Sequence, residues 1–344
     1  MAPSSTVLII GRAVTGIGAA GIATGGYAVL TVILTPAQRP LFTGLVTTMY
    51  SIASAVGPVI GGVFAEHVTW RWCFYINLPL GGTSALIMFV FFRESHVKRR
   101  KEQERLRVKL ATLDPLGFLL VLGVLLTFAR ALQVAGIDMP WRSGQVIGLL
   151  VASGVMMLLF GVEQHLQDHR AMLVKHLLRR RIILVTMAWA FCHEAAFYTL
   201  LYALPIYFQA ASGVSPAGAG IRNIPLLIAC GIGSLLAGWA IKRWRRHVPL
   251  MVLASAGGCV GTGLLYTLDA HSPSSKWIGY QVLAGFAYGV GLPLGVITGQ
   301  AGCSAEDLPA TTSMLLCKFW APSLILPLSS LSTLASAQPL VSTS

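Results

Sequence analysis

Three glycines near the N-terminus have the spacing of a phosphate-binding loop. Gly16, Gly18 and Gly21 form the pattern G-x-G-x-x-G shortly after an apolar run. In a dinucleotide-binding domain this pattern joins a strand to a helix, and an acidic residue about 20 positions further on binds the ribose. Here the first acidic residue of the chain is Glu66. The pattern therefore favours one long apolar helix with small residues along one face over a nucleotide site.

A histidine and a glutamate stand next to each other near the centre of another apolar stretch, residues 182–209. Titratable residues inside a membrane helix indicate a functional site by default, and imidazole and carboxyl groups take up and release protons. His193 and Glu194 are therefore candidates for binding a proton or for selecting a cationic substrate. Two other interpretations stay open: a pair satisfied within the helix bundle, or drift in a copy that has lost its function.

Arg12 is another charged residue inside an apolar run, about four residues from the start of that run. A charge in a membrane helix is costly unless it is paired or hydrated, so Arg12 is a functional candidate. The alternative is an arginine whose long side chain reaches the outer membrane interface.

Other kinds of chemistry lack their motifs in this sequence. The six cysteines form no C-x-x-C pair, and H-E-x-x-H, G-x-S-x-G and G-x-x-x-x-G-K-S/T are all absent. We therefore expect no metal, no cofactor and no ATP-driven step, and we do not expect an enzyme. The rival interpretation, a polytopic membrane enzyme, would need paired acids within the membrane, which the sequence does not supply.

The composition indicates which elements must position these residues. Hydrophobic residues make up 55% of the chain and charged residues 11%, and the mean hydropathy is +0.72. Soluble domains carry about 25% charged residues. We therefore expect an all-α, polytopic membrane helix bundle with about ten segments of bilayer-spanning length. The segments are approximately residues 6–34, 41–65, 73–92, 115–136, 144–163, 182–209, 220–241, 249–268, 277–302 and 309–336.

Lysine and arginine predict the orientation of these segments. Eighteen of the 25 Lys and Arg residues lie in four alternate connections, residues 35–40, 93–114, 164–181 and 242–248. Cytoplasmic connections carry such an excess, so these four are expected inside and the N-terminus outside. The net charge of +13 is then a topology signal, and no nucleic-acid partner is expected. An N-terminus outside is explained most simply by an odd number of helices missing upstream.

Several stretches resemble the major facilitator superfamily, and in particular the fungal proton-coupled drug and toxin exporters with fourteen spans. LIIGRAVTGIGAA (Leu8–Ala20) is similar to the fourth-helix motif, and ASAVGPVIGG (Ala53–Gly62) is similar to the fifth-helix antiporter motif. WRWCFYINLP (Trp70–Pro79) resembles the entry to helix six. The resemblance covers about residues 6–316, makes the first segment helix four, and implies that three helices are missing upstream.

The resemblance gives individual residues a role. Arg12, Gly16 and Gly18 match the fourth-helix motif, and Arg12 would take part in proton coupling. The antiporter motif would form a kinked helix that lets a neighbour pack closely and seals the route between the two membrane faces. Its residues in this chain are Ala53, Gly57, Pro58, Gly61 and Gly62.

The helix-six entry motif suggests a structural role. Trp70, Arg71 and Trp72 lie at the outer end of their segment, where tryptophans anchor at the level of the lipid headgroups. Asn77 and Pro79 follow within the first turns and are expected to shape the helix entry.

The resemblance implies an exporter that exchanges a small organic molecule, such as a drug, mycotoxin or other secondary metabolite, for protons. The alternatives are an inactive truncated fragment and a transporter of siderophores or organic ions. The expected partners are the substrate, protons and the lipid bilayer, with no obligate protein partner. We expect a multi-pass protein of the plasma membrane, with the vacuolar membrane as the alternative.

The resemblance to the fourteen-span exporters also divides the chain into five expected parts. They are residues 1–92 as a partial N-terminal bundle, 93–113 as a basic cytoplasmic linker, 114–165 as two extra central helices, 182–336 as an incomplete C-terminal bundle, and 337–344 as a tail.

Overall fold

The computed structural model describes residues 4–91, 114–136, 138–167, 172–269, 272–304 and 307–316. Within these ranges the chain is helical and has no β-strand, so the predicted fold class is confirmed. The helices are α1 (Ser5–Ile33), α2 (Arg39–His67), α3 (Trp72–Tyr75), α4 (Asn77–Phe91), α6 (Pro115–Val134), α7 (Gly144–Leu166), α8 (Lys175–Leu178), α9 (Arg181–Ser212), α10 (Pro216–Arg222), α11 (Ile224–Trp244), α12 (Val248–Tyr266), α13 (Ser274–Ala301) and α14 (Leu308–Leu316).

Nine stretches of helix in the described residues are long and apolar enough to cross a membrane. They correspond to the first nine predicted segments. The tenth, 309–336, is described only as far as Leu316, where α14 ends. The whole of the predicted basic linker and the whole of the predicted tail lie outside the described residues. Residues 5–33 form one continuous helix with no strand before the glycines, so the alternative of a nucleotide-binding loop is excluded.

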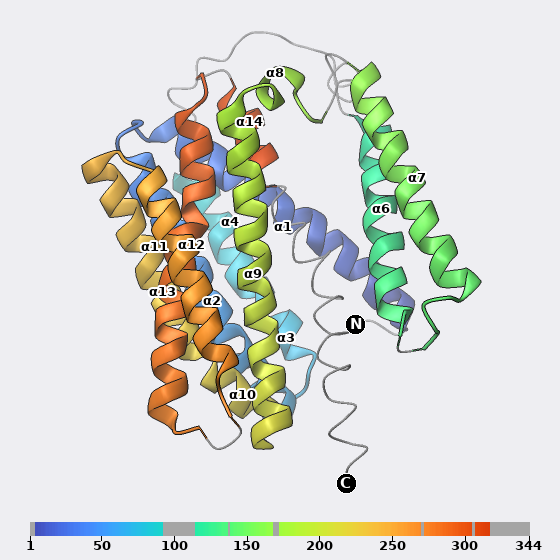
Figure 1. Ribbon diagram of the computed structural model, residues 1–344, viewed down its shortest axis with the longest axis vertical. Coiled ribbons are helices and arrows are strands. Elements are labelled where there is room, and N and C mark those ends of the chain that lie inside the picture. The colour runs from blue at the N-terminus through green and yellow to red at the C-terminus, as the bar shows by residue number, and fades with distance from the viewer. Residues whose placement is uncertain are drawn as a thin grey trace.

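Helix α13 is the centre of the bundle. It packs against α11, α12 and α9, and 83% of the residues in its most apolar stretch are buried inside the protein. Figure 1 shows α9, α11, α12 and α13 running side by side, and α2 packs along α11. Helices α1 and α4 are the opposite extreme, because no residue in their most apolar stretches is buried inside the protein. Their hydrophobic surfaces therefore require lipid or further protein to cover them.

Small residues decide how closely α11 and α13 approach. A Cβ atom added at Gly285 would collide with the carbonyl oxygen of Leu226, and one at Gly289 with that of Cys230. Gly285 and Gly289 are four residues apart, so they lie on one face of α13 and form the G-x-x-x-G contact typical of membrane helix pairs. Ser234 on α11 adds a hydrogen bond to the carbonyl oxygen of Gly289, with 2.9 Å between the oxygens.

Helices α6 and α7 pack on each other, and Figure 1 shows this pair beside the main bundle. Polar groups tie the pair together where α6 begins and α7 ends. The amide nitrogen of Gln164 lies 2.5 Å from a carboxylate oxygen of Asp114 and 2.6 Å from one of Glu163. Asp114 also accepts a hydrogen bond from the backbone nitrogen of Gly117 at 2.7 Å and so caps α6.

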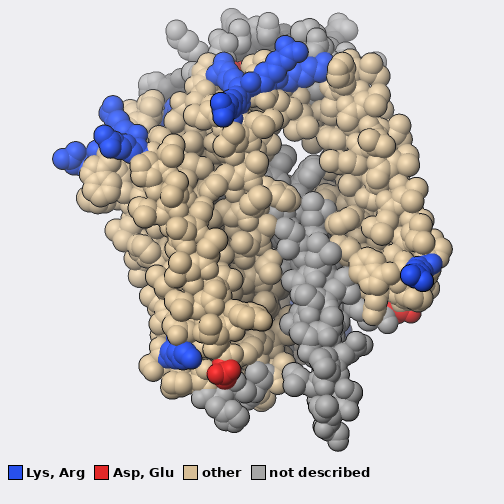
Figure 2. Space-filling view, in the orientation of Figure 1, with Lys and Arg blue, Asp and Glu red and all other residues tan. Residues whose placement is uncertain are grey.

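The basic residues gather at one end of the molecule. Figure 2 shows most of the visible Lys and Arg side chains along the edge that carries α8 and the turn between α11 and α12. Few lie at the opposite end, where the space-filling view shows single basic groups next to acidic ones. The separation is the one expected when a single end of a helix bundle faces the cytoplasm.

Candidate functional site

The buried polar centre of the bundle lies on α9. His193 is 7% exposed and Glu194 is 2% exposed, in the middle of a helix of 32 residues. Adjacent residues on a helix project about 100° apart, so the two side chains face different neighbours. The sequence predicted both residues, and the structure separates what each one contacts.

His193 faces α13. Its Nε2 atom lies 3.2 Å from the carbonyl oxygen of Tyr288, which fits an imidazole that donates from this nitrogen. The ring stacks on Trp189, with 4.8 Å between centroids and 16° between planes, and it lies 5.2 Å from the ring of Tyr288. A Cβ atom at Gly291 would collide with the imidazole. The missing side chain at Gly291 therefore makes the space that the histidine occupies.

Two hydrogen bonds extend this contact to α12. The indole nitrogen of Trp189 donates to the hydroxyl oxygen of Ser255 at 2.9 Å. The hydroxyl groups of Tyr288 and Thr262 are 3.0 Å apart. The histidine ring is thus held between two aromatic side chains that are both anchored to the same neighbouring helix.

Glu194 lies on a different face of α9, near Tyr198 of the same helix and Cys230 of α11. Its carboxyl group lies within electrostatic range of the Tyr198 hydroxyl and the Cys230 thiol. Tyr198 is hydrogen bonded to Tyr50 of α2, with 2.9 Å between their oxygens. The hydroxyl of Ser51, also on α2, lies 3.5 Å from the sulfur of Cys230. Tyr198 and Cys230 thus connect the surroundings of Glu194 to α2, the helix that carries the predicted antiporter motif.

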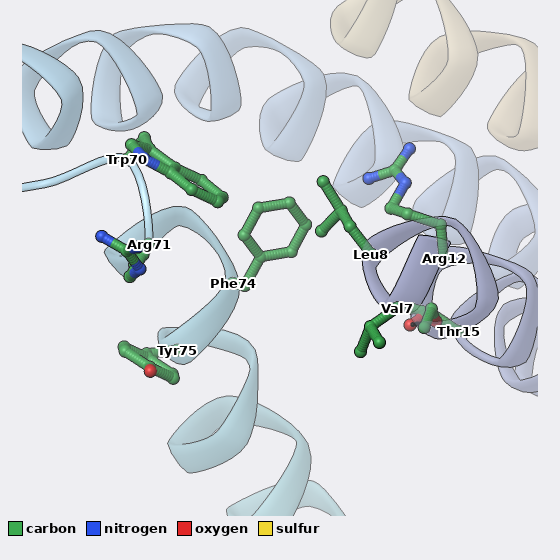
Figure 3. Close-up of a pocket in the computed structure, with 9 residues that line it drawn as sticks. Val7, Leu8, Arg12, Thr15, Trp70, Arg71, Phe74 and Tyr75 are labelled. Carbon is green, nitrogen blue, oxygen red and sulfur yellow. Dashed lines mark hydrogen bonds between the residues drawn. The ribbon is translucent and has the colours of Figure 1, made fainter. Parts of the chain in front are cut away.

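Arg12 belongs to a different site. Together with Thr15 it lines a cavity of about 290 Å³ between α1 and α3, whose other side is formed by Trp70, Arg71 and Phe74. Figure 3 shows the ring of Phe74 between Trp70 and Leu8, with Arg12 beside Leu8. The structure thus brings the fourth-helix and helix-six entry motifs together. It does not bring Arg12 to His193 or Glu194, because neither of these lines the cavity.

Arg71 contributes a cation–π contact to this cavity. Its guanidinium carbon lies 5.0 Å from the centroid of the Trp70 ring, and Phe74 meets the same ring edge-on at 6.1 Å. Exposed contacts of this type contribute about 0.5–1 kcal/mol. The cavity wall therefore combines aromatic faces with two arginines, and its aromatic faces suit a flat organic group.

Comparisons with known proteins identify the family. The sequence profile described as Major Facilitator Superfamily matches residues 1–315 of the chain. The chain belongs to the Major Facilitator Superfamily. Within this family it is similar to the MFS-type transporter thnB of Trichoderma harzianum, with 41% identity over 317 residues, or 91% of this chain and 54% of the relative.

Two further relatives of the superfamily carry similar names. The MFS-type transporter grgE of a Penicillium species is 38% identical over 92% of this chain and 56% of its own length. The efflux pump aunC of Aspergillus niger is 38% identical over 91% of this chain and 59% of its own length. The chain spans about half the length of the curated relatives it matches. The expectation of a multi-pass membrane protein from a family of transporters is confirmed.

The predicted antiporter motif lies on α2, where the packing differs from expectation. A Cβ atom at Gly57 or Gly61 would meet no atom of the described chain within 4 Å. At Gly62 it would lie 3.3 Å from the Cβ of Ala217, the one close approach among the three glycines. The expectation of a close-packed glycine face is thus corrected to contacts with α10 at Gly62 and at Pro58, whose Cβ atom lies 3.4 Å from a Cβ added at Gly220. Ala53 is exposed.

Pro58 does not end α2, because the helix continues through it to His67. The glycines of the predicted fourth-helix motif also lack a close neighbour. At Gly16 and Gly18 the structure places no neighbour within 4 Å of a Cβ, and both residues are exposed. The glycines that let helices approach are others, at positions that sequence reasoning passed over. They include Gly44 and Gly238 between α2 and α11, and Gly285 and Gly289 between α11 and α13.

The helix-six entry is a short helix followed by a longer one. Trp72 begins α3 and lies 6.2 Å from the ring of Phe64 on α2. Asn77 begins α4 and donates from its amide to the carbonyl oxygen of Cys73 at 3.5 Å. Pro79 sits in the first turn of α4, where its missing N–H costs no helix hydrogen bond. These positions fit the predicted role of shaping the helix entry.

Proposed function

We propose that this protein exports a small organic molecule in exchange for protons, and that it does so in the plasma membrane. The observation that carries the proposal is the burial of His193 and Glu194 in the middle of membrane-spanning α9. Burying titratable groups in a membrane helix is costly, and such groups mark proton pathways in transporters.

The contacts of Glu194 suggest how a proton is coupled to movement. Adding a proton to this carboxyl changes the local charge beside Tyr198, whose hydroxyl binds Tyr50 of α2. Helix α2 carries the predicted antiporter motif. A change of charge at Glu194 would therefore alter the contact between α9 and α2. Alternating access by rocking of helix bundles needs such a charge-sensitive contact.

His193 serves the same proposal from the other face of α9. It is positioned by Trp189 and Tyr288, which are both tied to α12. A proton on the second ring nitrogen would give the imidazole a positive charge in this apolar setting, and loss of the proton would restore neutrality.

The substrate is proposed to be a bulky, largely apolar organic compound such as a drug, mycotoxin or other secondary metabolite. The efflux pumps named among the relatives support export, and the cavity lined by Arg12, Trp70 and Phe74 offers aromatic faces to such a molecule. Arg12 would then contact the substrate on the outer side of the membrane, apart from the proton site.

The experiment uses the purified full chain in proteoliposomes, with ethidium as the transported probe and an imposed pH gradient. Wild type should move ethidium only when the gradient is present. Glu194→Gln should lose this dependence because its side chain no longer binds a proton. Glu163→Gln is the matched control, since Glu163 is a buried carboxyl of the α6–α7 pair and lies outside the proposed pathway.

Two results would contradict the proposal. Gradient-dependent movement that survives Glu194→Gln unchanged would remove this residue from the mechanism. Absence of any ethidium movement by the wild type, with a control exporter active in the same liposomes, would support the alternative of an inactive fragment.

A further inference from the structure

A second cavity lies at the cytoplasmic end of the molecule. Its volume is about 640 Å³, and it is enclosed by the turn between α1 and α2, the turn between α11 and α12, and the end of α13. It lies apart from the polar centre on α9, because neither His193 nor Glu194 lines it. Volumes of this size are typical of small-molecule sites.

The lining of this cavity is strongly basic. Arg39, Lys242 and Arg245 line it together with His247, and none of the lining residues in the described part of the chain carries a carboxylate. Arg39 is held in place, because its Nε and Nη2 atoms donate to the carbonyl oxygens of Leu34 at 3.3 Å and Thr31 at 2.8 Å. A guanidinium has five N–H donors, so this anchoring leaves donors for a ligand.

Arg245 adopts an unfavourable backbone conformation at the edge of this cavity. Its φ angle is 54°, and it is the one residue other than glycine with a positive φ in the described chain. Helices commonly end with a left-handed residue at this position, but glycine or asparagine usually occupies it. An arginine in this conformation costs about 1–2 kcal/mol of backbone strain. Residues with such strain cluster at functional sites.

His247 adds a polar atom that lacks a partner. Its Nδ1 atom is buried and forms no hydrogen bond to any residue that the structure describes. A buried nitrogen without a hydrogen bond is costly, and a bound group inside the cavity would be able to satisfy it.

We propose that this cavity binds a phosphate group through Arg39, Lys242, Arg245 and His247, supplied either by an anionic lipid headgroup or by a soluble phosphate ester. Guanidinium groups bind phosphate oxygens in pairs, and ammonium groups add a point charge. The cytoplasmic leaflet offers anionic lipids next to the cavity, and the cytosol offers soluble phosphates. Phosphate binding at this cavity requires no transport cycle. The proposed binding can therefore be tested independently of the proposed export.

The test measures binding to the purified full chain in detergent by native mass spectrometry. Phosphatidic acid is the lipid probe, glycerol 3-phosphate is the soluble probe, and phosphatidylcholine is the uncharged reference. Wild type should bind one of the two phosphate probes more tightly than phosphatidylcholine. Arg245→Gln should weaken that binding about tenfold, as expected for the loss of a charged hydrogen bond.

Neighbouring residues provide matched variants. Arg243 lies two positions away on α11, is exposed and does not line the cavity, so Arg243→Gln should weaken binding by less than about twofold. Arg245→Gly suits the left-handed backbone and removes the charge. It should therefore lose binding about as much as Arg245→Gln while keeping or raising the thermal stability.

The outcomes separate the sources and the alternatives. Binding of phosphatidic acid alone assigns the site to a lipid headgroup, and binding of glycerol 3-phosphate assigns it to a soluble ester. Equal losses in Arg243→Gln and Arg245→Gln would indicate a diffuse surface attraction and overturn the proposal. Absence of preference for either phosphate probe over phosphatidylcholine would overturn it as well.

Discussion

The hydroxyl oxygens of Tyr50 and Tyr198 lie 2.9 Å apart, and this hydrogen bond joins α2 to α9 one helical turn beyond Glu194. Tyr198 is buried, whereas Tyr50 is 49% exposed. The bond connects the helix of the antiporter motif to the helix of the proposed proton site, and no feature of the sequence pairs these two tyrosines.

Tyr198→Phe should lower the free energy of unfolding by about 0.5–1 kcal/mol, because it removes one hydrogen bond between membrane helices. Equilibrium unfolding of the full chain in mixed micelles measures the loss. Tyr202→Phe is the control, since Tyr202 lies on the same helix and is 51% exposed. Tyr50→Phe combined with Tyr198→Phe should cost no more than one single change. Additive losses would show that the hydroxyls do not interact.

Gly289→Ala should separate α11 from α13, because its new Cβ collides with the carbonyl oxygen of Cys230. We expect a loss of about 2 kcal/mol, in the range of overpacked cores. Gly279→Ala on the same helix meets no atom within 4 Å and should instead gain up to about 1 kcal/mol from helix propensity. Thermal unfolding of both variants provides the comparison, and equal effects would contradict the close helix contact.

Gln164→Leu should destabilise the α6–α7 pair by about 2–3 kcal/mol. The change removes the amide that bridges Asp114 and Glu163, and leaves buried carboxyl groups without that donor. Gln145→Leu, at an exposed position of α7, should stay within about 0.5 kcal/mol of wild type. Proteolysis or unfolding followed by a reporter on α7 measures the difference. A Gln164→Leu variant as stable as Gln145→Leu would show that the bridge contributes nothing.

His247 should make stability depend on pH. Burial lowers the pKa of this imidazole below its ordinary value of 6.5, because desolvation disfavours the charged form. The unfolded chain therefore binds the proton more readily. The contribution of His247 is complete above about pH 6.5 and is lost as the pH falls from there towards its lower folded pKa.

His247→Gln should accordingly reduce the fall in melting temperature between about pH 7.5 and about pH 5, because no proton is taken up at this position on unfolding. His165→Gln replaces an exposed imidazole and should leave the fall unchanged. Melting curves of the purified chain at both pH values give the measurement. A fall as large in His247→Gln as in wild type would show that the burial of this ring has no energetic effect.

The sequence by itself determined that the chain is a bundle of membrane helices of the Major Facilitator Superfamily. Low charge content and long apolar runs require helices, because the backbone polar groups of a membrane segment must be satisfied internally. The same reasoning found His193 and Glu194, because a titratable residue within an apolar run can be recognised from the sequence. Arg12, Trp70 and Arg71 were found through their motifs.

Only the tertiary structure decided which of these residues meet. A helix sequence shows which residues share a face, but not which neighbour that face contacts or how closely. The glycines of the recognised motifs, such as Gly16 and Gly57, have no close neighbour, whereas Gly44, Gly238, Gly285 and Gly289 touch the backbone of other helices. The cavity at Arg245 likewise joins three segments that are far apart in the chain. Contacts between distant segments depend on how the helices pack in three dimensions. The order of residues along one helix does not specify which other helix it packs against.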